Sequence, residues 1–275
     1  MPSQPQAGAR ERLRELIARV IGWFARRIPL RLAVILQEQL RVIERLDYEK
    51  SPIFLRIHSR LEHAYRIHSC KREPETVVWI EGQLRDGDIM FDVGANVGAY
   101  SLIAAKHSRG TARVYAFEPA FANFAALCEN IALNRCADSI VPLNIALSDQ
   151  TTLGTFNYSE LSAGSSLHAF GTNRSCKGQF TPLLQQLVLS YRVDDLLRTL
   201  PIPVPNLIKI DVDGIELEIL RGASNTLNDR QLRSLLVEIE PESEHRSAIC
   251  DLMDRHGFRL LPPWRQGSPN SIFVR

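Results

Sequence analysis

The sequence predicts an α/β fold in which a mostly parallel sheet follows a helical N-terminal extension. From about residue 75, short apolar runs typical of strands alternate with runs of helical periodicity, which is the pattern of a mostly parallel sheet. A glycine-rich turn at residues 92–98 separates the first strand from the first helix of this alternation. Upstream of Glu73-Pro74 the apolar spacing is helical. We therefore expect a helical extension at residues 1–73 and a main domain at residues 74–275.

The first half of the main domain contains three expected strands joined by two helices. The strands lie at residues 89–93, 114–117 and 139–147. The helices begin at Ala99 and after Pro119, and the apolar residues of the second helix share one face. Strands joined through helices in this way are expected to pair in parallel.

The second half departs from the alternation once. Residues 151–192 contain two strand-like runs, 155–158 and 187–191, that flank a polar loop rich in Gly and Ser. Long loops of this kind in compact domains are commonly functional. The alternation then resumes with a helix from Val193, a strand at 206–211, a helix from Gly214 to about Leu227, a strand at 235–239, a helix at 247–256 and a closing hairpin of 258–261 with 271–274.

The extension is expected to be helical, with breaks at Pro29 and Pro52 and a helix from Ser51-Pro52 through His68. Residues 10–31 combine seven arginines with an apolar stripe at helical spacing. Two interpretations follow from this pattern. The segment lies on an anionic membrane surface, or it packs on the main domain or on a second copy in a homodimer.

The overall composition limits the class of protein. Apolar residues make up 45% of the 275 residues, enough for a large core, and a net charge of +2 gives no strong attraction to nucleic acid. The five cysteines are odd in number and contain no C-x-x-C pair, so neither a zinc site nor a disulfide framework is expected. This cysteine usage fits a reducing cytosol, so we expect a cytoplasmic protein. The chain contains no apolar run of about 18 residues and does not begin like a secretory signal.

The turn Asp92-Val-Gly94-Ala-Asn96-Val-Gly98 indicates a nucleoside-cofactor site. A glycine-rich turn between a strand and a helix lets backbone N–H groups approach a ligand closely. The next strand ends in Glu118, and a carboxylate at this position suits the two hydroxyls of a ribose.

S-adenosylmethionine fits this turn better than a dinucleotide does. In a dinucleotide fingerprint the middle position is a glycine that lets the backbone reach the pyrophosphate, whereas here it is Asn96. Asp92 would repel a pyrophosphate but suits a cationic sulfonium and an ammonium group. An NAD(P)-linked oxidoreductase and a non-catalytic scaffold that binds the cofactor are the alternatives.

Several acids are expected at the carboxyl ends of the fourth and fifth strands, where open parallel sheets bind ligands. They are Asp211, Asp213, Glu216, Glu238 and Glu240. If the chain stays extended, Lys209, Asp211 and Asp213 point to one side. Asp211 is the first candidate to contact the acceptor and act as a base, and its alternative role is to cap the next helix. These acids could instead hold Mg²⁺, although our preferred interpretation contains no metal.

The loop at residues 162–168 is a second candidate for contact with the acceptor. Ser165 and Ser166 can hydrogen-bond a polar substrate, and His168 can serve as a base. The alternative is an ordinary solvated loop.

The matched motifs resemble those of the FkbM family of S-adenosylmethionine-dependent methyltransferases over about residues 85–260. The resemblance rests on Phe91-Asp-Val-Gly-Ala-Asn-Val-Gly98, Ala116-Phe-Glu-Pro119, Ile145-Ala-Leu-Ser-Asp149, Leu207-Ile-Lys-Ile-Asp-Val-Asp-Gly-Ile-Glu216 and Leu220-Arg-Gly-Ala223. One departure is Asp213, where the family usually carries Glu. The resemblance implies the class I methyltransferase (Rossmann-like) fold, a seven-stranded mostly parallel sheet with an antiparallel last strand.

The resemblance also implies methyl transfer to a hydroxyl of a sugar or secondary metabolite. The near-neutral charge, and Asp211-Val-Asp-Gly214 where nucleic-acid amino methylases carry a Pro-Pro-aromatic motif, argue against a nucleic-acid partner. The cofactor would contact Asp92, Gly94, Ala95, Asn96, Gly98, Tyr100, Ser101, Glu118, Pro119, Ala146 and Asp211. The expected catalytic residues are Asp211, Asp213 and His168.

Overall fold

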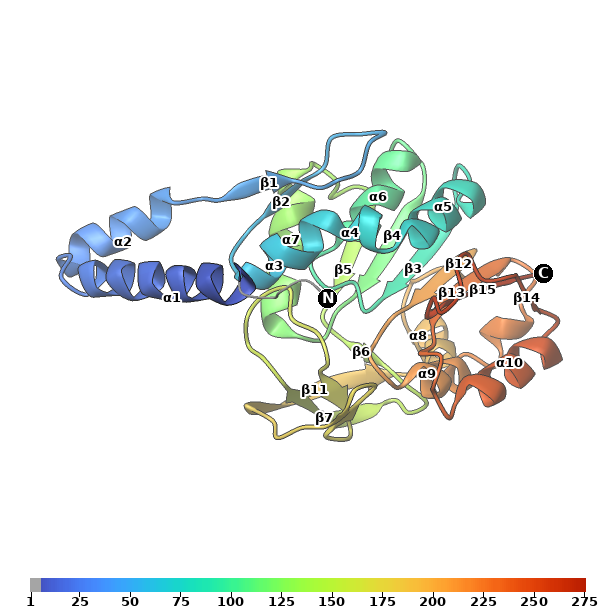
Figure 1. Ribbon diagram of the computed structural model, residues 1–275. Helices are drawn as coiled ribbons and strands as arrows, with labels where there is room; N and C mark the ends of the chain where they lie inside the picture. Colours follow the sequence, from blue (N-terminus) through green and yellow to red (C-terminus); the bar gives the residue numbers. More distant parts are fainter. Residues whose placement is uncertain (1–5) are drawn as a thin grey trace. The chain divides into compact units, whose positions relative to one another are not determined.

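The computed structural model describes residues 6–275, and the chain divides into two compact units. The first unit extends to Val42 and contains α1 (Gln6–Ala25) and α2 (Leu30–Gln39), with Pro29 as the break between them (Figure 1). The second unit runs from Ile43 to Arg275. Residues 43–73 therefore belong to the second unit, and the expected boundary after residue 73 does not coincide with the observed division.

A seven-stranded sheet of order β14-β15-β13-β12-β3-β4-β5 organises the second unit (Figure 1). Its strands are β3 (Ile89–Val93), β4 (Arg113–Phe117), β5 (Ile140–Leu143), β12 (Leu207–Ile210), β13 (Ser234–Glu238), β14 (Arg259–Leu260) and β15 (Asn270–Val274). Strands β13, β12, β3, β4 and β5 pair in parallel, whereas β15 is antiparallel to both β13 and β14. The expected sheet and its closing hairpin are confirmed.

Helices pack against both faces of this sheet because neighbouring strand residues point to opposite sides. In β3, Met90 belongs to one core cluster and Phe91 to the other. The first cluster includes residues of α5 (Pro74–Gln83), α6 (Ala99–His107) and α7 (Phe121–Leu133), and the second those of α8 (Val193–Thr199), α9 (Glu216–Gly222) and α10 (Arg246–Arg255). The carboxyl ends of the parallel strands therefore meet at one edge of a doubly wound sheet.

A second sheet forms from the region that interrupts the alternation. Its order is β6-β11-β7-β8, with β6 (Ala146–Leu147), β7 (Thr152–Tyr158), β8 (Ala169–Phe170) and β11 (Leu184–Tyr191). The two strand-like runs are confirmed as the antiparallel pair β7 and β11. Between them, β9 (Arg174–Ser175) and β10 (Gly178–Gln179) make a small hairpin.

The single strand expected at residues 139–147 is wrong, because the chain divides it into β5 and β6. β5 pairs with β4, whereas β6 pairs with β11 of the second sheet. Asn144 lies at the division, and its side-chain amide donates to the carbonyl oxygens of Glu118 (2.8 Å) and Pro119 (3.1 Å). This side chain holds the chain against the end of β4 while the backbone changes sheet.

The helix expected to begin at Ser51-Pro52 is also wrong. Two short strands, β1 (Ile43–Arg45) and β2 (Phe54–Arg56), pair there, and the helical residues follow as α3 (Arg60–Tyr65), η1 (Arg66–His68) and α4 (Ser69–Arg72). Ser59 caps α3, since its hydroxyl accepts from the N–H of Glu62 and the Glu62 carboxylate accepts from the N–H of Ser59. This reciprocal capping box sets the start of the helix.

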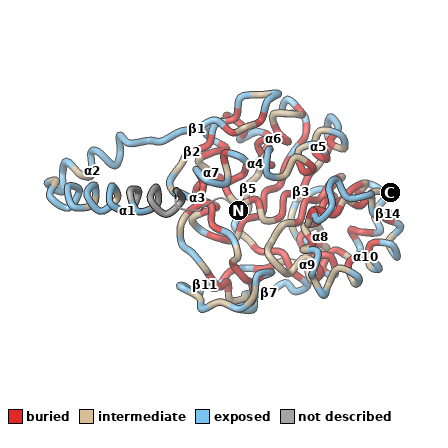
Figure 2. The backbone as a smooth tube through the Cα atoms, viewed as in Figure 1, coloured by how far each residue is buried: buried red, intermediate tan, exposed pale blue. Residues whose placement is uncertain are grey.

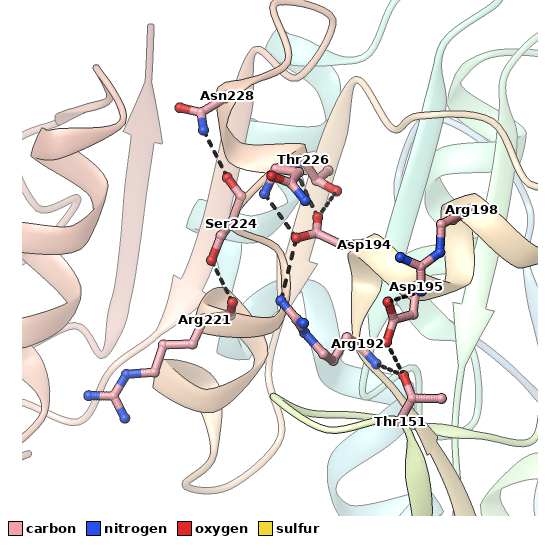
Figure 3. Close-up of polar contacts among 10 residues, drawn as sticks. Thr151, Arg192, Asp194, Asp195, Arg198, Arg221, Ser224, Thr226 and Asn228 are labelled. Carbon is pink, nitrogen blue, oxygen red and sulfur yellow. Dashed lines mark hydrogen bonds and ion pairs between the residues drawn. The ribbon is translucent and has the colours of Figure 1, made fainter.

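Asp194 explains why the helix expected to reach Leu227 ends at Gly222. Figure 3 shows Asp194, in the first turn of α8, facing the segment after α9. Its carboxylate accepts from the N–H groups of Asn225 and Thr226, both at 2.9 Å, and from the Thr226 hydroxyl at 2.8 Å. These bonds supply acceptors for the free N–H groups at the start of a separate short helix, η2 (Thr226–Asn228).

Gly222 is expected to tolerate no side chain. A Cβ there would lie 2.1 Å from the carbonyl oxygen of Ser148, so we expect Gly222→Ala to destabilise the protein by about 1–3 kcal/mol or more. Gly82, in α5, is the matched control because a Cβ would have nothing within 4 Å. Gly82→Ala should be neutral or stabilise by up to about 1 kcal/mol. Urea unfolding measures both, and equal effects would contradict the prediction.

Candidate functional site

The glycine-rich turn leads from β3 directly into α6. Gly94 has a φ angle of +79°, a conformation that side-chain-bearing residues rarely adopt. The N–H groups of Gly94 and Ala95 both donate to the carbonyl oxygen of Phe117 at 3.0 Å, which fixes the turn to the end of β4. A Cβ at Gly94 would lie 1.9 Å from the carbonyl oxygen of Asp211, so the turn also passes close to the end of β12.

A cavity of about 230 Å³ lies where these strands end. Eight of the thirteen predicted site residues line it: Gly94, Asn96, Glu118, Pro119, Ala146, His168, Asp211 and Asp213. Asp92, Ala95, Gly98, Tyr100 and Ser101 lie outside this lining. The predicted site residues therefore converge on one cavity. The five that do not line it lie in β3, in the turn after β3 and in α6.

The residues behind the cavity hold its wall in place. Asp92 is fully buried and accepts from the Ser101 hydroxyl at 2.6 Å, while its second oxygen has no hydrogen-bond partner among the described residues. The Tyr100 hydroxyl donates to the carbonyl oxygen of Ser69 at 3.2 Å. The N–H of Gly98 donates to the carbonyl oxygen of Ala95, which closes the turn.

Glu118 stands at the end of β4 and is nearly fully buried. One carboxylate oxygen accepts from the N–H of Asn96 at 2.7 Å and the other from the N–H of Ala120 at 2.9 Å. Burial raises its pKa to about 7, although the two N–H donors oppose the shift. The carboxylate is thereby oriented towards the cavity before any ligand binds.

The raised pKa of Glu118 predicts a pH-dependent stability. Its pKa in the folded protein, about 7, exceeds the ordinary value of 4.5, so its contribution to the free energy of unfolding is present below about pH 4.5 and is lost as the pH rises through about 7. In ligand-free protein this loss should be on the order of 3 kcal/mol. Glu118→Gln cannot ionise and should lack this decline. Urea unfolding of both proteins at about pH 5 and about pH 8 tests this, and parallel pH profiles would contradict it.

Lys209 is a fully buried cation in β12. Its Nζ lies 2.8 Å from an Asp211 oxygen and 3.7 Å from an Asp92 oxygen, and it faces the Tyr100 ring at 5.1 Å. Burial opposes its charged form, but the charges of Asp211 and Asp92 outweigh burial and raise the pKa of Lys209 above its usual value. The lysine therefore carries a charge that joins the turn after β3 to the end of β12.

Asp211 is the ionised carboxylate at the centre of this edge. Burial opposes its ionisation, but Lys209 outweighs burial and lowers the pKa of Asp211 below its ordinary value. Two neighbouring carboxyls shift the other way, since the charge of Asp211 together with burial raises the pKa of Glu238, and burial raises that of Glu73. Among these three carboxyls, Asp211 is the one whose pKa shifts in favour of the ionised form.

For an extended chain, the sequence predicted that Asp213 shares a face with Lys209 and Asp211. The chain does not stay extended there. β12 ends at Ile210, and Asp213 adopts a φ angle of +66°, so the backbone has already turned. Its carboxylate accepts from the N–H of Leu167 at 2.6 Å. Burial and the nearby charge of Asp211 raise the pKa of Asp213 to about 6.

The loop at residues 162–168 is fixed beside the cavity at several points. The carbonyl oxygen of Ser165 accepts from the side-chain amides of Asn96 (2.8 Å) and Asn123 (3.1 Å). The Arg66 guanidinium donates two hydrogen bonds to the carbonyl oxygen of Gly164. The Asn96 side chain therefore holds this loop, although the same residue also lines the cavity.

His168 lies within this loop and lines the cavity, but both ring nitrogens are engaged. Nε2 lies 3.0 Å from the Ser165 hydroxyl and Nδ1 lies 3.2 Å from the Ser159 hydroxyl. Its ring packs against Phe156 and Tyr158. Burial lowers the pKa of His168 to about 4, so the imidazole is neutral near pH 7.

Several cavity-lining residues escaped the sequence-based prediction, among them the polar residues Arg66, Glu73 and Asn123. Glu73 was interpreted as a domain boundary because it precedes Pro74. Asn123 and Arg66 carried no motif that marks a site. Among residues 6–275, no group of three or more His, Cys, Asp or Glu side chains is arranged to hold a metal ion.

Comparisons with known proteins identify relatives of this chain. A family model described as the methyltransferase FkbM domain matches residues 92–260. The chain is 29% identical over 180 residues to the hexuronic acid methyltransferase AglP of Haloferax volcanii, covering 65% of this chain and 67% of that protein. It is 26% identical over 198 residues to the 31-O-demethyl-FK506 methyltransferase FkbM of Streptomyces tacrolimicus, covering 65% and 75%. Among solved structures, a methyltransferase FkbM from Methylobacillus flagellatus KT aligns with a TM-score of 0.48 and 13% identity over 77% of this chain and 62% of its own.

Proposed function

This chain belongs to the FkbM family of methyltransferases, and on that premise we propose that it moves a methyl group from S-adenosylmethionine to a hydroxyl oxygen of a small molecule or glycan. The catalytic domain corresponds to the second unit, in which residues 74–275 supply the sheet. The observation that carries the proposal is the joint position of Gly94 and Glu118 on one cavity at the carboxyl ends of β3 and β4.

The residues present fit an adenosyl ligand with a cationic sulfonium. Glu118 offers a pre-oriented carboxylate for two ribose hydroxyls. Gly94 lines the same cavity, and its missing side chain lets the turn lie against the backbone of Asp211. Ala146 and Pro119 line the cavity beside Glu118, where a planar base would be accommodated. Asp211 contributes negative charge on the same cavity, which favours a positive ligand over an anionic pyrophosphate.

The names of two relatives support an oxygen acceptor on a small molecule or sugar. One is named for hexuronic acid and the other for 31-O-demethyl-FK506. Asp211 is the side chain we assign to the acceptor, because it is ionised, lines the cavity and is held by Lys209 at 2.8 Å.

S-adenosylmethionine supplies an electrophilic methyl group when it is bound. Most of the catalytic contribution of the protein is then positioning, since the acceptor oxygen must lie in line with the methyl carbon. The Asp211 carboxylate accepts a hydrogen bond from the acceptor hydroxyl and receives its proton as the oxygen becomes acidic during bond formation. Residues 165–168 line the cavity beside this position, where we expect them to limit the access of water.

Thermal unfolding in the presence of separate ligands tests this function. S-adenosylhomocysteine at about 100 times its dissociation constant should add roughly 2.7 kcal/mol to the free energy of unfolding. For a protein of this size we expect a rise in Tm of several degrees. NAD+ should give no shift, and Glu118→Ala should lose most of the shift with S-adenosylhomocysteine. A shift with NAD+ alone would overturn the proposal in favour of an oxidoreductase.

A further inference from the structure

The first unit presents large apolar side chains to solvent. In α1 the side chains of Leu16, Ile17, Val20, Ile21 and Phe24 are all exposed, with Ile21 at 62%. In α2 no residue is buried, and Leu30 is 79% exposed. Figure 2 shows α2 and the C-terminal half of α1 in the colour of exposed residues along almost their whole length. Exposed apolar surface this continuous marks a site of interaction.

The apolar residues of α1 lie on one face of the helix. Ile17, Val20, Ile21 and Phe24 follow the three- and four-residue spacing that brings side chains to the same side. Arg12 and Arg19 are seven residues apart and lie on the opposite side of the helix. A helix with an apolar face and arginines on the opposite side is suited to a boundary between an apolar phase and water.

α2 differs from α1 because its apolar residues surround the helix. Leu32, Val34, Ile35 and Leu36 are consecutive or nearly so, and all are exposed. A helix that is apolar on all sides is normally buried in a core or in lipid. Within residues 6–275, however, no helix is long and apolar enough to cross a membrane. This combination favours insertion into an interface over transmembrane insertion.

The positive charge of residues 1–42 favours binding to an anionic surface. Residues 1–42 contain eight arginines and three glutamates, with no lysine or aspartate. Trp23 is half-exposed, and the Arg27 guanidinium stacks 3.4 Å from the centre of its ring. Tryptophan and arginine together are enriched where acyl chains meet headgroups.

We propose that α1 and α2 bind the surface of an anionic lipid bilayer. Their apolar side chains enter the boundary between headgroups and acyl chains, and the arginines pair with lipid phosphates. A second copy of this chain is a poorer occupant, because it would bring two segments of the same positive charge together. The inference is independent of the methyltransferase function, since it concerns only the first unit.

Vesicle co-sedimentation of the full chain tests the proposal. Wild-type protein should bind phosphatidylcholine vesicles that contain phosphatidylglycerol and should bind pure phosphatidylcholine vesicles at least tenfold more weakly. Phe24→Glu should weaken binding to the anionic vesicles at least tenfold because it places a negative charge on the apolar face. Leu153→Glu is the matched control, since Leu153 is an equally exposed leucine of the second unit, and its binding should equal that of wild type.

Folding of each variant is checked by its Tm without ligand or lipid, a readout that does not depend on the proposed function. Equal sedimentation with both kinds of vesicle, or equal binding by Phe24→Glu and wild type, would overturn the proposal. A failure of wild type to sediment with anionic vesicles would overturn it as well. If the protein is then a dimer in size-exclusion chromatography and Phe24→Glu makes it monomeric, a second copy occupies this surface.

Discussion

Lys209→Met should lower the free energy of unfolding by about 3–5 kcal/mol, because it removes the cation from a buried ion pair and leaves the acids behind. Lys209 is 1% exposed, as is Asp92, and its Nζ is the cation within 4 Å of both Asp92 and Asp211. Methionine matches the volume of lysine closely, so the loss arises from charge and not from a cavity. Without the ammonium group, Asp92 and Asp211 must either remain charged in a poorly solvated site or bind protons.

Urea unfolding at neutral pH measures the effect of Lys209→Met. Lys50→Met is the matched control, because Lys50 also pairs with a carboxylate, that of Glu81 at 2.6 Å, but is 62% exposed. An exposed pair contributes about 0–1 kcal/mol, so the control should stay close to wild type. Adding Asp92→Asn to Lys209→Met should recover part of the lost stability, since it removes one unpaired charge. Similar losses for Lys50→Met and Lys209→Met would contradict the assigned role of the buried cation.

The pairing between Lys209 and Asp211 shows where the two-residue alternation of a strand predicts side-chain direction correctly. Their spacing of two residues predicted a common side of the strand, and the 2.8 Å contact confirms it. The same rule failed for Asp213, because the strand ends at Ile210 and the backbone turns. The periodicity extends to Asp211, whose N–H still donates to the carbonyl oxygen of Val93, and it is lost where the backbone turns before Asp213.

Glu118 and Asp211 could be placed at carboxyl ends of strands from sequence because each follows a strong apolar run. The anchors of the loop at 162–168 could not, because Asn96, Asn123 and Arg66 reach it from three different elements. Their side chains bind carbonyl oxygens of the loop, and a carbonyl oxygen carries no sequence signal. The start of α3 was available from the spacing Ser59-x-x-Glu62, but the proline at position 52 suggested an earlier start.

Asp211→Asn should lower kcat by about 10²–10⁴-fold, the range expected when a positioned proton acceptor is lost. Asparagine keeps the size of the side chain and can still accept a hydrogen bond, so the acceptor hydroxyl remains close. Its amide oxygen is a far weaker base than the carboxylate and cannot take the proton as the new bond forms. Because Glu118 and Gly94 are unchanged, the Tm shift with S-adenosylhomocysteine should persist.

Methyl transfer to a hydroxylated acceptor, measured at saturating S-adenosylmethionine, separates Asp211 from its neighbours. Asp213→Asn and His168→Gln are the comparison variants. One oxygen of Asp213 already accepts from Leu167, and both nitrogens of His168 face serine hydroxyls, so both side chains are engaged with the loop at 159–168. We expect both variants to retain more activity than Asp211→Asn. If His168→Gln loses activity while Asp211→Asn keeps it, the base is His168. If all three variants match wild type, proton transfer goes directly to water and Asp211 acts only as the partner of Lys209.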